Sequence, residues 1–372
     1  MPALADVIRR YGPAYIERFG DRMPPSHRRA MRDLAACRTA ALGGQLTRCD
    51  HCGDERYVYH SCRNRSCPAC HGSETRHWAS ARRAELLPVP YYHVVFTLPK
   101  ELRGTVRSHQ RKLLSALVTA AAHSLIQLAA DPRYAGGRIG LLSVLHTWTR
   151  DLAYHPHVHC LVPGGALTRD GRQWVPTRAT FLVPVRALSV LFRARFMALA
   201  RKALPAERFP ESIWKTSWVV YCKPTVQGVA KVVDYLARYV HRIAITNSRL
   251  VSAEDGTVTF RYKDAEAQRW RTTTLPATEF LRRFLQHVLP RGFHKVRYYG
   301  LLSPAYRQTL RQVQLVLSPG RPDTGSGIRS PGCTSEDALP SAPDRAPYKC
   351  TSCHAGVLLV IAWIPRLIRA PP

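Results

Sequence analysis

Residues 154–162 have the sequence Tyr-His-Pro-His-Val-His-Cys-Leu-Val, with a histidine at every second position from 155 to 159. Successive side chains of a β-strand point to opposite faces, so His155, His157 and His159 would share one face. Neighbouring histidines would be roughly 6.6 Å apart along the strand, so that two imidazoles could bind one ion, whereas three in a row would span roughly 13 Å and could not. We therefore expect a metal-binding strand that takes at least one ligand from elsewhere. The alternative is a strand whose polar face is rich in imidazole.

The segments around this strand predict an α+β fold. Residues 91–98 and 140–148 have the composition of strands, and residues 102–128 between them carry apolar residues at helical spacing. This order is typical of an antiparallel sheet with helices on one face and the other face open to a substrate. The remaining elements are expected to be a helix at 185–203, a strand at 218–222, a hairpin at 250–274 and a helix at 279–289.

A further helix is predicted around residues 229–240, where valine and leucine recur at helical spacing. It would carry Tyr235 and Tyr239 on one face, one turn apart. Two core tyrosines are the structural alternative. Beside a metal-binding strand, the pair is better interpreted as two nucleophiles for one phosphate, with Arg238 or Arg242 stabilising the charge that develops.

Two Cys-x-x-Cys pairs, Cys49 with Cys52 and Cys67 with Cys70, are separated by fourteen residues. Two such turns can supply four thiolates to a tetrahedral structural Zn²⁺ site. Cys62 is an additional candidate, because it could replace one of the four, help to bind a second ion, or only pack. The pairs therefore predict a zinc module in the first quarter of the chain.

A third pair, Cys350 with Cys353, has no evident partner in the sequence. Cys333 and His354 could complete a site, and the absence of any metal is at least as good an interpretation. The chain contains eleven cysteines. In an intracellular protein this number suggests metal ligands and buried thiols rather than disulfides.

The composition points to a polyanionic partner. There are 55 lysines and arginines against 25 aspartates and glutamates, a formal net charge of +30. Such an excess favours nucleic acid. With no signal-peptide pattern and no apolar run of bilayer length, we expect a cytoplasmic, nucleoid-associated protein that has no membrane partner. Residues 318–348, rich in proline, glycine and serine, are predicted to be a flexible linker.

Several stretches resemble known proteins. His157-Val158-His159 is similar to the His-hydrophobe-His (HUH) signature of rolling-circle nucleases, in which two histidines hold a divalent ion and a tyrosine attacks DNA. Residues 61–70, 235–242 and 275–300 resemble the transposases of the insertion-sequence-91 family. The resemblance extends over roughly residues 5–310.

The resemblance implies a transposase that nicks and rejoins single-stranded DNA through a 5′-phosphotyrosine, in rolling-circle-type transposition. It implies Mg²⁺ or Mn²⁺ as the catalytic ion, whereas ligand softness alone would favour zinc, copper, iron or nickel. For the missing ligand we expect His93 ahead of His155. Arg63 and Arg65, in the stretch that resembles the family's zinc-binding domain, would face DNA.

These expectations combine into one layout of the chain. It comprises a helical DNA-binding segment (1–40), a zinc-ribbon-like domain (41–90), an HUH catalytic domain (91–317), the linker (318–348) and a C-terminal tail with half a zinc site (349–372). A plasmid replication initiator or relaxase with the same chemistry is the nearest alternative function. A non-catalytic zinc-ribbon regulator is a second alternative, which would need neither the histidines nor the tyrosines.

Overall fold

A computed structural model describes residues 2–70, 85–225, 240, 243–264, 266–317 and 348–367. The chain divides into two compact units. The larger consists of Met1–Ala35 and Arg63–Leu317, and the smaller of Ala36–Cys62 and Ser318–Pro372. The smaller unit is thus discontinuous in the sequence, with most of the chain inserted between its two parts.

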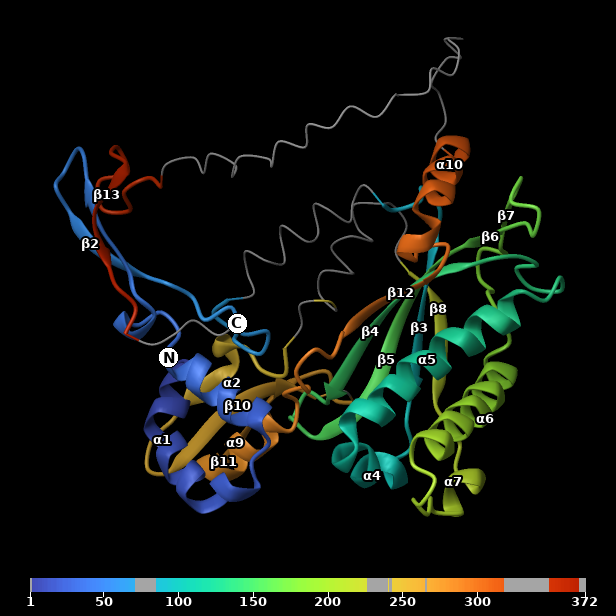
Figure 1. Cartoon of the computed structure of the whole chain (residues 1–372), viewed down its shortest axis with the longest axis horizontal. Coiled ribbons are helices and arrows are strands. Elements are labelled where there is room, and N and C mark those ends of the chain that lie inside the picture. Colours follow the sequence, from blue (N-terminus) through green and yellow to red (C-terminus); the bar gives the residue numbers. More distant parts are fainter. Residues whose placement is uncertain are drawn as a thin grey trace, which may run out of the picture. The chain divides into compact units, whose positions relative to one another are not determined.

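The larger unit is built around a five-stranded antiparallel sheet with the order β12-β4-β5-β3-β8 (Figure 1). The strand that carries the three histidines, β5, lies at its centre. The strands are β3 (Tyr91–Thr97), β4 (Gly140–Trp148), β5 (Tyr154–Pro163), β8 (Val220–Pro224) and β12 (Val296–Gly300).

Two long helices, α5 (Gln110–Ala129) and α6 (Val185–Ala203), lie along one face of this sheet (Figure 1). Val158, Cys160 and Val162 of β5 point to that face and are buried in the main hydrophobic core. Helix α5 is long and apolar enough to span a bilayer, but 61% of its apolar window is buried inside the protein. Packing against the sheet therefore accounts for its apolar sequence.

The opposite face of the sheet carries the histidines, because side chains alternate along β5. A smaller apolar cluster of Tyr91, Leu142, Val144, Leu161 and Val240 lies on this histidine face. The first four residues come from β3, β4 and β5, whereas Val240 ends the segment in which the tyrosine helix was predicted. The histidine face is therefore partly covered by apolar side chains next to the histidines.

The other elements of the larger unit lie outside the main sheet and its two covering helices. The N-terminal helices α1 (Leu4–Phe19) and α2 (Pro25–Ala35) pack with each other, and α1 also packs on α9 (Ala277–Leu285). A three-stranded sheet of order β11-β10-β9 precedes α9. The remaining bounds are α4 (Arg103–Ser108), β6 (Gly165–Leu167), β7 (Trp174–Pro176), α7 (Ser212–Lys215), β9 (Leu250–Ser252), β10 (Thr257–Lys263), β11 (Trp270–Pro276) and α10 (Arg307–Leu317).

The smaller unit contains a three-stranded antiparallel sheet of order β13-β1-β2. Its strands are β1 (Gly44–Cys49), β2 (Glu55–Tyr59) and β13 (Leu358–Ile364). The register places Gly44 opposite Ile364 and Cys49 opposite Leu358, with an irregularity between Leu46 and Thr47. A strand from the C-terminal end of the chain therefore pairs with one from its N-terminal part.

The predicted α+β class is confirmed, with antiparallel sheets and helices on one face of the largest. The helix expected at 102–128 is interrupted, because His109 leaves the helical conformation (φ −118°, ψ 44°) between α4 and α5. The hairpin expected at 250–274 has a third strand, β9. The tyrosine helix, apart from Val240, and residues 318–347 of the predicted linker lie outside the described residues.

Candidate functional site

Three histidines meet at the centre of the main sheet: His146 on β4, and His157 and His159 on β5. One ring nitrogen of each lies within 4.8 Å of one nitrogen of each of the others. The register explains this arrangement, since His146 is directly opposite His157 and Val144 is opposite His159. Three imidazoles at this separation can converge on a single ion. We call these three residues the histidine triad.

The ring of His157 has a defined tautomer. Its Nδ1 lies 2.7 Å from the backbone carbonyl oxygen of His155. A carbonyl oxygen only accepts, so Nδ1 must carry the proton and donate it. In the neutral ring Nε2 then holds the lone pair, which is the arrangement of a metal-binding imidazole whose other nitrogen is fixed by a hydrogen bond.

The expected third ligand, His93, has a different place. Its Nε2 lies 2.8 Å from Nδ1 of His159, with the two rings stacked at 5.1 Å between centroids. Burial, with a smaller effect from Lys223, lowers the pKa of His93 to about 4, so the ring is neutral near pH 7. His93 therefore orients His159 through a hydrogen bond and is not a member of the triad.

His155 also lies outside the triad. The pairing of β4 with β5 is irregular between the partners His146–His157 and Trp148–Tyr154, so the strict alternation stops before His155. Its Nδ1 lies 2.6 Å from Nη2 of Arg103 and accepts a hydrogen bond from it. The observed third histidine, His146, was missed because it follows a run of apolar residues on a different strand.

Among the described residues, Tyr221 of β8 is a tyrosine that could be considered as a nucleophile near the triad. Val95 is opposite both Tyr221 and His159, so these three residues form one row across the sheet. Two strand spacings separate the outer members, roughly 10 Å between Cα atoms. Tyr221 is 44% exposed and Lys223 lies over its ring. The predicted nucleophiles and their arginines lie outside the described residues: Tyr235, Tyr239, Arg238 and Arg242.

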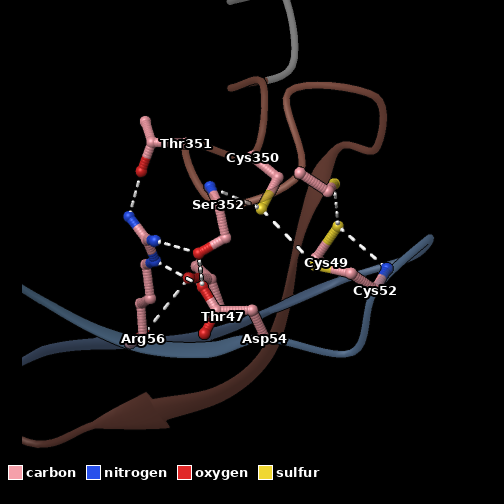
Figure 2. Close-up of polar contacts among 9 residues, drawn as sticks. Thr47, Cys49, Cys52, Asp54, Arg56, Cys350, Thr351 and Ser352 are labelled. Atoms are coloured by element: carbon pink, nitrogen blue, oxygen red, sulfur yellow. Dashed lines mark hydrogen bonds and ion pairs between the residues drawn. The ribbon is translucent and has the colours of Figure 1, made fainter.

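The cysteines are grouped differently from the predicted single site. The thiols of Cys49 and Cys52 lie with those of Cys350 and Cys353, all four within 4.8 Å of one another. Figure 2 shows Cys49, Cys52 and Cys350 of this group. The pairing of β1 with β13 accounts for the change, because it brings the C-terminal pair beside Cys49. The pair that lacked a partner in the sequence thus has one in the structure.

The other predicted pair, Cys67 and Cys70, belongs to the larger unit, and both of its cysteines are buried. Cys62, expected as an alternative ligand, is the last residue of the first part of the smaller unit and is also buried. The two pairs were expected to share one ion, whereas Cys49 and Cys52 are grouped with Cys350 and Cys353.

Arg65 is exposed, but its guanidinium is engaged in hydrogen bonds within the larger unit. Its guanidinium donates hydrogen bonds to the backbone carbonyl oxygens of Phe293 (2.7 Å), Leu289 (2.7 Å) and Pro290 (2.8 Å). The prediction from the sequence was that this guanidinium would face DNA and contact a phosphate. Arg63, two residues earlier, is exposed and has a left-handed backbone conformation (φ 51°). Arg63 therefore remains the better candidate for a phosphate contact.

Comparisons with known proteins identify the family of the chain. A family model described as "Putative transposase" matches residues 140–309, which include the histidine triad, and one described as "Transposase zinc-binding domain" matches residues 7–98. The chain is 40% identical to "Putative transposase y4qJ" of Sinorhizobium fredii, over 97% of this chain and 95% of that protein. The chain belongs to the IS91 family of transposases. This confirms the transposase interpretation.

A second relative of this IS91-family transposase is "Transposase for insertion sequence element IS801" of Pseudomonas savastanoi pv. phaseolicola. It is 30% identical over 73% of this chain and 68% of that protein. No solved structure matches the chain. Membership of the family implies a DNA-cleaving and strand-transferring enzyme with DNA as its substrate. The matched zinc-binding domain and the cysteine groups support structural zinc.

Proposed function

We propose that the protein nicks and rejoins single-stranded DNA in rolling-circle-type transposition, through a 5′-phosphotyrosine formed on Tyr235 or Tyr239. The observation that carries the proposal is the histidine triad. His146, His157 and His159 meet on the face of the sheet opposite the one that packs on α5 and α6. A phosphodiester bound to the triad would lie on that face.

The donor set fits a divalent ion. The triad offers three imidazole nitrogens within 4.8 Å of one another, and hydrogen bonds from neighbouring groups fix two of the rings. Mg²⁺ or Mn²⁺ would keep further coordination positions for water and phosphate oxygens. Such an ion supplies Lewis-acid polarisation of a phosphoryl oxygen when bound. The work of the protein is to hold the rings in this geometry and to position the nucleophile.

The tyrosine assignment is supported by Val240. This residue is buried in the apolar cluster on the histidine face, beside Val144, which is the partner of His159. Lys295 donates a hydrogen bond of 3.2 Å to the carbonyl oxygen of Val240 and so fixes its backbone. In the sequence Val240 directly follows Tyr239, so the segment predicted to carry the nucleophiles adjoins a residue of the histidine face.

The proposed chemistry balances without another reactant. The phenol oxygen attacks phosphorus, a phosphorus–tyrosine bond forms, the bond to the 3′ oxygen breaks, and that oxygen leaves as a hydroxyl after taking up a proton. Attack by a 3′ hydroxyl on the phosphotyrosine reverses the step and returns the phenol. The energy of the phosphodiester is retained, so that rejoining needs no ATP. A second tyrosine allows a second transfer before the first is resolved.

The test is a nicking assay on single-stranded DNA from the ends of the element, with Mg²⁺ or Mn²⁺. Denaturing gels should show DNA attached to protein through its 5′ end. If both tyrosines act, Tyr235→Phe and Tyr239→Phe should each retain adduct but fail in complete strand transfer, and the double variant should form none. Phenylalanine keeps the packing and removes only the hydroxyl, so a structural tyrosine would tolerate the change.

Tyr221→Phe is the matched control, because Tyr221 is exposed on the same face of the sheet. It should form adduct like the parent. The contrary result is adduct formation by the Tyr235/Tyr239 double variant that disappears when Tyr221 is also replaced. This result would contradict the assignment and identify Tyr221 of β8 as the nucleophile. Metal-dependent cleavage without any adduct would point to water as the nucleophile and would overturn the phosphotyrosine proposal.

A further inference from the structure

The two halves of the smaller unit present the same cysteine turn twice. In the first, the amide of Gly53 donates to the carbonyl of Cys49 (3.1 Å), and in the second the amide of His354 donates to the carbonyl of Cys350 (3.0 Å). The residue after the second cysteine is left-handed in both, with φ of 73° at Gly53 and 58° at His354. The left-handed conformation is uncommon outside glycine, and histidine is one of the residues that tolerate it. Both turns therefore have the same backbone form.

Backbone amides point at the sulfur atoms in both turns. Cys52 N lies 3.5 Å from Cys49 Sγ, Ser352 N lies 3.4 Å from Cys350 Sγ, and Gly356 N lies 3.4 Å from Cys353 Sγ. Hydrogen bonds of this kind favour the thiolate. Both turns therefore direct backbone donors at the sulfur atoms.

The distances between the turns match a tetrahedral ion. Cys49 Sγ lies 3.7 Å from Cys353 Sγ, and Cys52 Sγ lies 3.8 Å from Cys350 Sγ. Four sulfur atoms at 2.3 Å from a central Zn²⁺ are separated by about 3.8 Å along each edge of the tetrahedron. A disulfide would require about 2.05 Å. The sulfur atoms are thus at the spacing of shared metal coordination and not of covalent pairing.

The chain around the sulfurs is fitted to the same arrangement. A Cβ atom on Gly356 would lie 2.5 Å from Cys49 Sγ and 2.6 Å from Oδ1 of Asp50. Only glycine fits there. The Asp50 carboxylate accepts a hydrogen bond from Val357 N (2.7 Å), and the Asp50 amide donates one to the Val357 carbonyl (3.1 Å). The two turns are therefore joined by their backbones as well as by the ion they would share.

A polar contact outside the sulfurs fixes the second turn on β2 (Figure 2). Arg56 donates to Asp54 (2.6 Å) and to the hydroxyl of Ser352 (2.7 Å), and Ser352 in turn donates to Asp54 (3.0 Å). This network holds the C-terminal turn without any contribution from the thiols. The site is thus preorganised and not a chance meeting of cysteines.

We propose that Cys49, Cys52, Cys350 and Cys353 bind one structural Zn²⁺, so that the C-terminal segment is an integral part of the zinc module. The zinc-binding family model covers only residues 7–98 and leaves the second pair unassigned. Four thiolates fill the coordination sphere, so this ion holds the two ends of the chain together and takes no part in cleavage.

The first experiment measures zinc per chain by elemental analysis of the full-length protein. The double variants Cys49→Ser/Cys52→Ser and Cys350→Ser/Cys353→Ser should each lose about one ion, and the quadruple variant should lose no more than either. Cys222→Ser, which changes a half-buried cysteine outside this group of four, should keep the parent's content. Unchanged zinc in the C-terminal variant, or iron in place of zinc in the parent, would overturn the proposal.

The second experiment uses the unaltered protein and does not depend on a variant folding. Thiol alkylation with mapping by mass spectrometry should find all four cysteines protected together and released together when a chelator is added. Rapid labelling of Cys350 and Cys353 while Cys49 and Cys52 stay protected would contradict a shared ion. Neither measurement uses DNA cleavage, so its outcome is independent of the proposed tyrosine chemistry.

Discussion

Three histidines of β5 have identified hydrogen-bond partners, and these partners distinguish the proposed ligands from supporting residues. His159 is hydrogen-bonded to His93, His157 to the backbone carbonyl of His155, and His155 to Arg103. His93 therefore contacts the proposed ligand His159 without belonging to the triad, and His155 contacts Arg103 of α4. Substitutions at these neighbouring positions should therefore have different effects on nicking and on metal binding.

At the residue scale, His146→Ala should abolish metal-dependent nicking as completely as His157→Ala does, because each would remove one of three ligands. His93→Ala should instead weaken metal binding about 10–100-fold, the usual effect of losing the partner that orients a ligand. The measurement is nicking rate against metal concentration, with DNA binding as the check on folding. Excess metal should restore activity to His93→Ala only.

His155→Ala is the matched control for this series. It removes an imidazole from the same strand and leaves the backbone carbonyl that holds His157. Near-parental nicking is expected. A loss equal to that of His146→Ala would instead identify His155 as the third ligand and would contradict the triad.

The hydrogen bonds of Arg65 should contribute to the stability of the fold. Arg65→Ala removes a charged donor from three backbone carbonyls, and a hydrogen bond to a charged group contributes about 1.5–3 kcal/mol. We expect the free energy of unfolding to fall by that order, measured as a lower urea midpoint with an unchanged slope. Arg63→Ala, at an exposed position, should leave the midpoint unchanged and weaken DNA binding slightly. The reverse pattern would show that Arg65 serves DNA.

The sequence predicted two of the triad residues because both lie on one strand with a spacing of two. The third could not be predicted in the same way, since His146 becomes a neighbour of His157 only through the register between β4 and β5. Register depends on the whole sheet and on the turn between the strands. Local spacing therefore identifies ligands within a strand and misses those across it.

At the element scale, a buried histidine ties the end of α9 to the turn between β4 and β5. Nδ1 of His287 lies 3.2 Å from the hydroxyl of Thr147, and Nε2 lies 3.2 Å from the carbonyl oxygen of Leu152. Burial lowers the pKa of His287 to about 3. Burial disfavours the charged ring at this position, so the junction should be sensitive to acid.

The sign of the effect follows from the two pKa values. In the unfolded chain His287 takes up a proton near pH 6.5, whereas in the folded chain it stays neutral to about pH 3. Its contribution to stability is therefore complete above pH 6.5 and is lost as the pH falls toward 3. Tm should decrease between pH 7 and 4.

His287→Gln should be less stable at pH 7 and should show a shallower decrease of Tm toward pH 4, because glutamine does not titrate. The exposed His294→Gln is the control and should follow the parent curve. Parallel curves for His287→Gln and the parent would show that His287 does not set the acid sensitivity. His27, whose pKa burial lowers to about 4, should account for part of what remains.

At the scale of the whole molecule, the formal charge of +30 makes DNA affinity depend on salt. Neutralising phosphates releases counterions, and a protein with about six to ten phosphate contacts loses roughly 10³–10⁵ in affinity for duplex DNA between 50 and 200 mM salt. Fluorescence anisotropy should show this linear decrease on logarithmic axes, with a slope lower by about one for Arg63→Ala. A flat response would mean that the excess charge does not serve DNA.

The grouping of the cysteines shows where prediction from sequence stops at this scale. The Cys-x-x-Cys spacing identified three turns correctly, because each turn is a local structure. Spacing favoured a shared site for the two nearest pairs, but Cys49 and Cys52 lie with the pair from the other end of the chain. Such a partnership depends on a strand pairing between distant segments, and local spacing carries no information about it.

The pairing of β1 with β13 also determines when this part of the protein can fold. Cys52 and Cys350 are 298 residues apart, so a ribosome adding 5–20 residues each second needs about 15–60 s to make the second after the first. During that time one edge of β1 has no partner strand, and the catalytic layer is synthesised before the partner arrives. A protein truncated after residue 317 would therefore contain every strand of the main sheet, but its N-terminal sheet would lack the strand β13 that pairs with β1.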